Sequence, residues 1–463
     1  MSLGSFFEGE ICYTCNFITF LYLIALHLML LASTFANSKV MNILVLTLVT
    51  FYATRLFIIQ INPYFYTYND WIPSSSEMSQ VMSVLFFISS GLILGCYIGG
   101  KMGKGYRGNF HIIPFSKDVD EKKYYYLIIL IFIVSKLILL YLLVTTGVGL
   151  PLDAHFFNPL LLRFAKIARS FGVFGLVPIS WFILRKPQGA ERKITIFAVA
   201  LFVISTIISL SKVALIYAIT PFLLVYYVTN IKIPPRLIKA SVTIIIAVVI
   251  IMSSLVASLR YGLTNSFSGD GKLSYGGEAV SMISNNVLGF LGRVGSSFDV
   301  LSLTVTQRDQ FLPFANIRNE FLSVVNGYWP GGFFSIDAPP WSQILYTIGH
   351  PGVSYESLLE IATGENITLP AHLYINFGTT GSCLVSFFLM LFYTLAYRYS
   401  KTVVVKIFLI YSLIFDISNG GGLVGMVIGY PMLYLWFFLV FIIYKFFFHT
   451  SRSQNPIVIE PTF

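Results

Sequence analysis

Two histidines lie in the polar part of this chain, and imidazole is the side chain best suited to carry a proton near neutral pH. His350 lies in the sequence GHPG, and His372 lies in PAHLYINFG, where an apolar span begins. The positive end of a helix dipole at that position would favour the neutral imidazole, which can act as a base. Glu356 and Glu360, one helical turn apart, are the alternative acid/base candidates. A structural role remains open for each of these side chains.

A second group of residues has the charge needed to bind an anion. Lys212 lies between two apolar spans, and Arg260 and Arg293 lie in polar sequence close to apolar sequence. Lysine and arginine bind phosphate oxygens, arginine through a bidentate fork. Arg308 and Arg318, each near an acid (Asp309 and Glu320), are expected to be surface residues.

Arg163, Lys166 and Arg169 recur every three residues and would form a basic stripe on a helix opposite Phe157, Leu161 and Leu162. Two interpretations stay open. The stripe could belong to an amphipathic helix on the membrane surface. Alternatively, it could bind phosphate.

Tyr328, Trp329 and Trp341 lie in a stretch rich in Gly and Pro. Their rings could stack on sugars, or they could anchor a loop at the membrane interface, where Trp and Tyr are enriched. The sequence holds no phosphate-binding glycine loop, no nucleophile elbow, no HExxH zinc motif and no loop DxD pair. We therefore expect neither a metal nor another cofactor.

The composition places these residues on a membrane protein. Hydrophobic residues make up 56% of the 463 residues and charged residues 11%, whereas soluble domains contain about 25% charged residues. Spans of about 20 apolar residues are membrane helices, because a bilayer accepts only closed backbone structure. The sequence predicts spans at 17–34, 41–60, 80–99, 124–146, 171–184, 194–211, 213–229, 240–258, 371–396, 403–419 and 423–444.

The positive charges alternate between successive connections. Segments 100–123, 185–193 and 230–239 are rich in Lys and Arg, whereas segments 1–16 and 61–79 contain none. Lys and Arg mark the cytoplasmic side, so the net charge of +10 reports topology and does not indicate a nucleic-acid partner. This rule places the N-terminus and the long segment before residue 370 outside the cytoplasm, and the C-terminus inside.

The expected fold class is therefore an all-α polytopic transmembrane helical bundle of about eleven spans with one large extracytoplasmic loop of short helices. Residues 1–258 would carry eight spans, residues 259–369 the loop, and residues 370–463 three spans and a tail. Lys136, Arg55 and Asp416 lie within the predicted spans, where ionisable groups are costly. Arg55 could reach the outer surface, whereas Lys136 needs a buried partner or a polar path.

Three features resemble the bacterial O-antigen polymerases of the Wzy type, which are related to the O-antigen ligases. These features are the span plan with its late loop, the segment PAHLYINFGTTG at 370–381, and ISLSKVALIYA at 208–218. The family pattern is matched by Tyr374, Asn376, Phe377, Gly378 and Gly381. The sequence departs from it where polymerases often have Glu and this chain has His372, and where Lys212 replaces the commoner Arg.

The resemblance implies an enzyme of the bacterial inner membrane that polymerises oligosaccharide units carried on undecaprenyl pyrophosphate, with membrane lipids and a chain-length regulator protein as further candidate partners. In such a reaction His372 would be the base or acceptor orienter, and Glu356 and His350 remain the other catalytic candidates because of their acid/base chemistry. The expected ligand-binding residues for pyrophosphate and glycan are Lys212, Arg260, Arg293, Arg163, Arg169, Tyr374, Asn376 and Trp329. An O-antigen ligase and a lipid-linked glycan flippase or transporter are the alternatives.

Overall fold

A computed structural model describes those parts of the chain that form the helical body. The described residues are 21–22, 24–29, 32, 38–56, 73–102, 121–146, 175–185, 188–208, 212–229, 297–311, 317–328, 341, 344–345, 348, 367–400, 403–418, 422–424, 426–427, 439 and 442–446. Within these ranges the regular structure is helical, without a strand. The expected all-α class is confirmed for this part of the chain.

The helices follow one another in the order in which apolar segments occur in the sequence. They are α2 (Lys39–Leu48), η2 (Val49–Ala53), α4 (Ser75–Met102), α5 (Glu121–Thr146), the short helix Gly175–Leu184, α7 (Gly189–Ile208), α8 (Lys212–Thr229), the short helix Ser297–Thr306, α11 (Arg308–Phe311), α12 (Ile317–Tyr328), α15 (Leu369–Tyr399), α16 (Val403–Ser418) and α17 (Gly422–Val424).

Four stretches of helix are long and apolar enough to cross a membrane: Lys39–Leu56, Ser76–Met102, Tyr125–Leu142 and Leu369–Tyr399. They coincide with the predicted spans 41–60, 80–99, 124–146 and 371–396. The predicted span 240–258 lies outside the described residues, so the total of about eleven spans and the orientation of the termini stay predictions.

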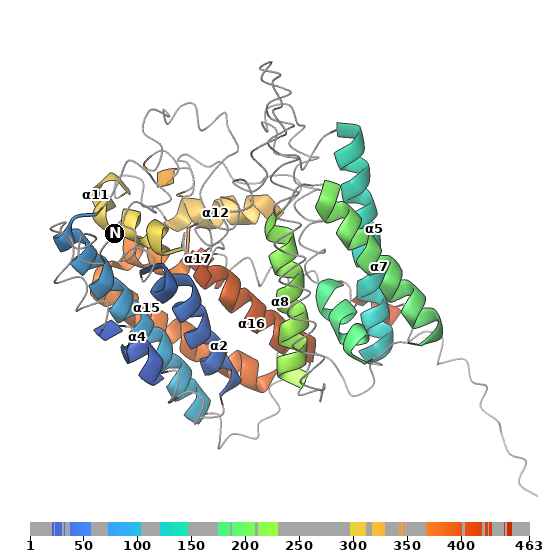
Figure 1. The fold of residues 1–463 in the computed structure, drawn as a ribbon, viewed down its shortest axis with the longest axis horizontal. Helices are drawn as coiled ribbons and strands as arrows, with labels where there is room; N and C mark the ends of the chain where they lie inside the picture. Colours follow the sequence, from blue (N-terminus) through green and yellow to red (C-terminus); the bar gives the residue numbers. More distant parts are fainter. Residues whose placement is uncertain are drawn as a thin grey trace, which may run out of the picture.

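The described helices enclose two apolar cores. In Figure 1, α2, α4 and α15 of the first core lie on the left, and α5 and α7 of the second core lie on the right. The first core lies between α2, α4, Ser297–Thr306, α15 and α17. The second lies between α5, Gly175–Leu184, α7 and α8. Helix α16 contributes Leu413 and Ile417 to the first core and Ile407 and Ile410 to the second, so it joins the two halves.

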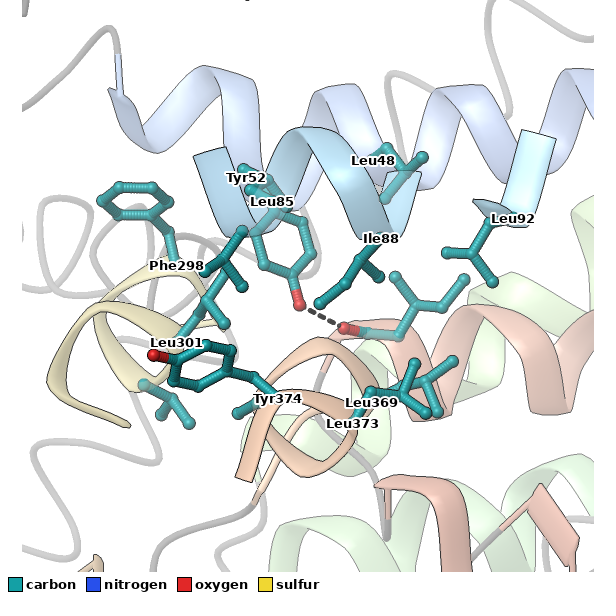
Figure 2. Packing of buried hydrophobic residues seen from close by; sticks show 14 of the residues in the cluster. Leu48, Tyr52, Leu85, Ile88, Leu92, Phe298, Leu301, Leu369, Leu373 and Tyr374 are labelled. Atoms are coloured by element: carbon teal, nitrogen blue, oxygen red, sulfur yellow. Dashed lines mark hydrogen bonds between the residues drawn. The ribbon is translucent and has the colours of Figure 1, made fainter. Parts of the chain in front are cut away.

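Ser297–Thr306 is a helix of the predicted loop, but it packs inside the first core. Phe298 and Leu301 are fully buried there against Tyr52 of η2 and Leu85 of α4 (Figure 2). The loop assignment did not anticipate this burial. The chain therefore inserts a short apolar helix from its long polar segment next to the start of α15, whose Leu369 and Leu373 line the same core (Figure 2).

Helices α4 and α15 lie against each other along their length because α4 has glycine at every fourth position of the contact. A Cβ atom at Gly95 would lie 2.2 Å from the carbonyl oxygen of Phe387, and one at Gly91 would lie 2.3 Å from that of Cys383. A Cβ at Gly99 would approach the backbone oxygen of Leu391 to 3.1 Å. Small residues of this spacing allow close backbone approach between membrane helices.

Replacing Gly95 by Ala should therefore separate α4 from α15. The added methyl group meets backbone rather than a movable side chain, and such overpacking typically costs about 1–3 kcal/mol. We expect a lower apparent melting temperature for the purified protein in detergent. Gly100→Ala is the matched control, because a Cβ there would have nothing within 4 Å. Equal melting temperatures for the two variants would contradict the close approach.

Candidate functional site at the start of helix α15

The first two turns of α15 bring together the described residues that the sequence singles out. Thr368 is the N-cap, and Pro370 occupies the first turn, where its missing N–H is no loss. The N–H of His372 bonds the carbonyl of Thr368 at 3.0 Å. Residues 369–375 are all buried, so this helix starts inside the protein rather than at its surface.

The side chain of His372 is buried, with only 2% of its surface exposed. Its Nδ1 accepts a hydrogen bond from the backbone N–H of Leu423, in α17, at 3.0 Å. The ring of Trp341 packs edge-on against the imidazole, with centroids 4.5 Å apart. Backbone on one side and an indole on another therefore fix the orientation of the ring.

This geometry determines which nitrogen carries the proton. Because Nδ1 accepts the Leu423 N–H, the neutral imidazole has its proton on Nε2. Nε2 is buried, and it has no hydrogen-bond partner among the described residues. His372 in this state can donate a hydrogen bond through Nε2 and cannot take up a proton there.

Gly422 makes the close contact between α17 and His372 possible. Its φ of 58° lies in the left-handed region that favours glycine. A Cβ atom there would lie 2.5 Å from Nδ1 of His372. A side chain at this position would displace the imidazole from the Leu423 N–H.

Glu320 of α12 contacts the backbone of Trp341, the residue whose ring packs on His372. The carboxylate is buried and accepts a hydrogen bond from the backbone N–H of Trp341. Burial raises the pKa of Glu320 to about 7, and the bond from the Trp341 N–H opposes that rise. Arg318 is exposed, as expected, whereas the neighbouring Glu320 is buried.

Tyr374 leaves α15 on the side opposite His372, because side chains two positions apart on a helix point in nearly opposite directions. Its hydroxyl accepts a hydrogen bond from the side-chain amide of Gln80 at 3.4 Å. The guanidinium carbon of Arg308 lies 5.4 Å from the centre of the Tyr374 ring, which is a cation–π contact. Arg308 is half-buried, and its Nε has no hydrogen-bond partner among the described residues.

The helix α15 breaks at Gly378, one turn after Tyr374. Gly378 has φ 63° and ψ −168°, values that no helix contains. A Cβ at this position would lie 3.9 Å from Nη2 of Arg308. The glycine of the INFG sequence therefore interrupts the span beside a cation.

Arg55 does not reach the surface, which corrects the sequence expectation. Its guanidinium binds both carboxylate oxygens of Asp299, at 2.9 and 2.6 Å, and both side chains are fully buried. This pair joins the span Lys39–Leu56 to Ser297–Thr306. Lys136 lies over the rings of Phe132 and Phe202, which gives the cation a structural environment within the protein.

Of the residues expected at the site, His372, Tyr374 and Asn376 are described. The side chain of Asn376 donates to the His372 carbonyl at 2.8 Å, within its own helix. Lys212 begins α8, as the expected break between two spans requires. The Lys212 side chain and the other candidates lie outside the described residues: His350, Glu356, Arg163, Arg169, Arg260, Arg293 and Trp329.

Arg308 and Glu320 were not expected at the site. Both look like ordinary charged surface residues, since each has an oppositely charged neighbour within two positions. Only the fold, which places Ser297–Thr306 in the core and α12 beside α17, brings them to α15. No local signal in the sequence distinguishes them.

In comparisons with known proteins, no family model, no curated protein and no solved structure matches the chain.

Removing one partner of the Arg55–Asp299 pair should destabilise the protein strongly. Asp299→Leu and Arg55→Leu each leave a buried charge without its counter-ion, which typically costs about 3–5 kcal/mol. The double variant buries no charge, so its apparent melting temperature should exceed the value expected from adding the two single effects. Simple additivity in this double-mutant cycle would contradict the coupling.

Gly422→Ala should release the imidazole of His372 and abolish whatever activity the site has. Its control is Gly189→Ala, because Gly189 has nearly the same φ, 57°, but nothing within 4 Å of a Cβ. Both variants carry the backbone strain, of about 1–2 kcal/mol, and only Gly422→Ala collides with His372. Activity and melting temperature should therefore fall further in Gly422→Ala; equal losses would show that the contact is irrelevant.

Proposed function

We propose that this protein polymerises undecaprenyl-pyrophosphate-linked oligosaccharide units into O-antigen or a related surface polysaccharide. The reaction takes place at the periplasmic face of the bacterial inner membrane. A hydroxyl oxygen of one lipid-linked unit forms a bond to the reducing-end anomeric carbon of the growing chain. The bond from that carbon to the pyrophosphate oxygen breaks, and undecaprenyl pyrophosphate leaves with the bonding electrons. A base takes the hydroxyl proton.

The N–H donor of His372, buried at the start of an apolar helix, is the observation that carries this proposal. Such a donor is costly unless an acceptor arrives to use it. An oxygen of the glycan or of the leaving pyrophosphate is such an acceptor. Hydrogen bonds aimed at an oxygen on which negative charge develops are a main source of rate acceleration in enzymes.

His372 acts in this proposal as the group that orients a substrate oxygen, because its Nδ1 is engaged by Leu423 and its Nε2 carries the proton. The general base is then another residue, and Glu356 and His350 are the remaining candidates from the sequence. The pyrophosphate is already an activated leaving group, so placement and charge stabilisation supply most of what the reaction needs.

Arg308 supports the same reaction as a pyrophosphate contact. Its guanidinium is half-buried over Tyr374, next to the open backbone at Gly378. Phe377 is 40% exposed, so the broken part of α15 is accessible to a ligand. Lys212, Arg260 and Arg293 remain proposed partners for the same anion, because each adds a positive charge from the predicted outer side.

The O-antigen ligase is the second candidate, and His372 favours it, because the ligases place His at the corresponding motif. Deleting the gene separates the two. Loss of a polymerase leaves a single repeat on the lipopolysaccharide core, whereas loss of a ligase leaves bare core and accumulated lipid-linked polymer.

The decisive experiment supplies the protein in proteoliposomes with lipid-linked repeat units extracted from the deletion strain. A polymerase makes a ladder of lipid-linked chains from units added to the outside. A transporter makes none. We expect His372→Ala and Arg308→Ala each to reduce the rate by about 100- to 1,000-fold, the typical effect of removing one donor to a developing charge.

Arg318→Ala is the matched control for Arg308→Ala, because Arg318 is an exposed arginine on the neighbouring α12. It should leave the ladder unchanged. Normal ladders from His372→Ala would rule out the proposed role of this residue, and no ladder from the wild-type protein would rule out the polymerase.

A further inference from the structure

A chain of contacts connects Glu320 to the imidazole of His372. The carboxylate of Glu320 accepts the backbone N–H of Trp341, and the Trp341 ring packs on the imidazole at 4.5 Å. On another side of the imidazole, the Leu423 N–H bonds its Nδ1. The ring is thus held between two groups, one of which is itself held by Glu320.

A buried carboxyl group is unfavourable, and an apolar side chain of the same size would be cheaper at this position. Glu320 is nevertheless buried, and its carboxylate oxygen accepts a hydrogen bond from the backbone N–H of Trp341. Removing the acceptor of a buried N–H typically costs about 1–3 kcal/mol, so we expect Trp341 to shift when the Glu320 oxygen is lost. The side chain of Trp341 is the one that packs edge-on against His372.

We infer that Glu320 is a positioning residue, which fixes the Trp341 indole against His372 and so keeps the imidazole buried and aligned. Glu320 does not touch the reacting atoms in this role. It contributes the oxygen that accepts the Trp341 N–H and so holds the Trp341 backbone in place. The inference rests on the proposed function only for its activity readout, because the burial of His372 can be measured without any substrate.

Two variants of similar size separate the effect of the acceptor oxygen from the effects of side-chain volume and charge. Glu320→Gln keeps an oxygen that can accept the Trp341 N–H. Glu320→Met fills the same space without an acceptor and introduces no charge, so it should fold. Asp309→Asn, at an exposed acid on α11, controls for the loss of one negative charge.

The first readout is modification of His372 by diethylpyrocarbonate, quantified by peptide mass spectrometry relative to denatured protein. Wild type, Glu320→Gln and Asp309→Asn should protect His372. Glu320→Met should raise its modification several-fold, because the indole no longer covers the imidazole. Only the monodisperse fraction from size-exclusion chromatography is labelled, so unfolded protein does not contribute.

The second readout is polymerisation in proteoliposomes loaded with the extracted lipid-linked units. A displaced catalytic group lowers kcat more than it changes KM, and a misplacement of about 1 Å can cost 100-fold. We expect Glu320→Met to lose about 10- to 100-fold in kcat with little change in KM. Glu320→Gln should recover most of that loss.

Wild-type protection of His372 in Glu320→Met would overturn the inference. Equal exposure of His372 in the Gln and Met variants would also overturn it, because the acceptor oxygen would then not matter. If the wild-type protein makes no polymer, the proposed function fails, while the labelling result still decides whether Glu320 positions Trp341.

Discussion

The close approach of α4 and α15 is the constraint on which the rest of the structure depends. Gly95 brings the α4 backbone against the carbonyl of Phe387, and Gly91 does the same one turn earlier. Within an apolar solvent, such helices associate through packing and polar contacts, since burial of apolar surface drives little. The contact fixes the axis and rotation of α15 after its break at Gly378. Before the break, the hydrogen bond from Gln80 to the Tyr374 hydroxyl links α4 to the turns that carry His372 and Tyr374.

Buried polar contacts then determine what packs around that helix. The Arg55–Asp299 pair holds Ser297–Thr306 in the first core, where the next residues of the chain lead to Arg308 beside α15. The hydroxyl of Tyr52 donates to the carbonyl of Ile417 at 2.7 Å (Figure 2) and so ties η2 to the end of α16. Each such group is expensive to bury alone, so each favours the arrangement that supplies its partner.

Hydropathy predicted the helical class and the four described spans because apolar length alone decides whether a segment can cross a bilayer. Hydropathy placed the start of a span near His372, and the proton chemistry of imidazole singled out that residue. Hydropathy could not identify Asp299 as the partner of Arg55, because Asp299 lies 244 residues away in a segment predicted to be a polar loop. The burial of Glu320 was not predicted for the same physical reason, because it depends on a tertiary contact with Trp341.

The tautomer of His372 changes which part of the chemistry this residue can perform. A general base at the start of α15 would need a bare nitrogen facing the substrate, and the Leu423 N–H already occupies the only one that the neutral ring has. The same bond directs the proton to Nε2, where a substrate oxygen can accept it. Because pyrophosphate is already a good leaving group, it needs little protonation but must be positioned accurately. A fixed N–H donor positions it while the imidazole stays neutral. The rigid enclosure by Gly422 and Trp341 is consistent with that demand, because a donor aligned before the substrate arrives needs no reorganisation during the reaction.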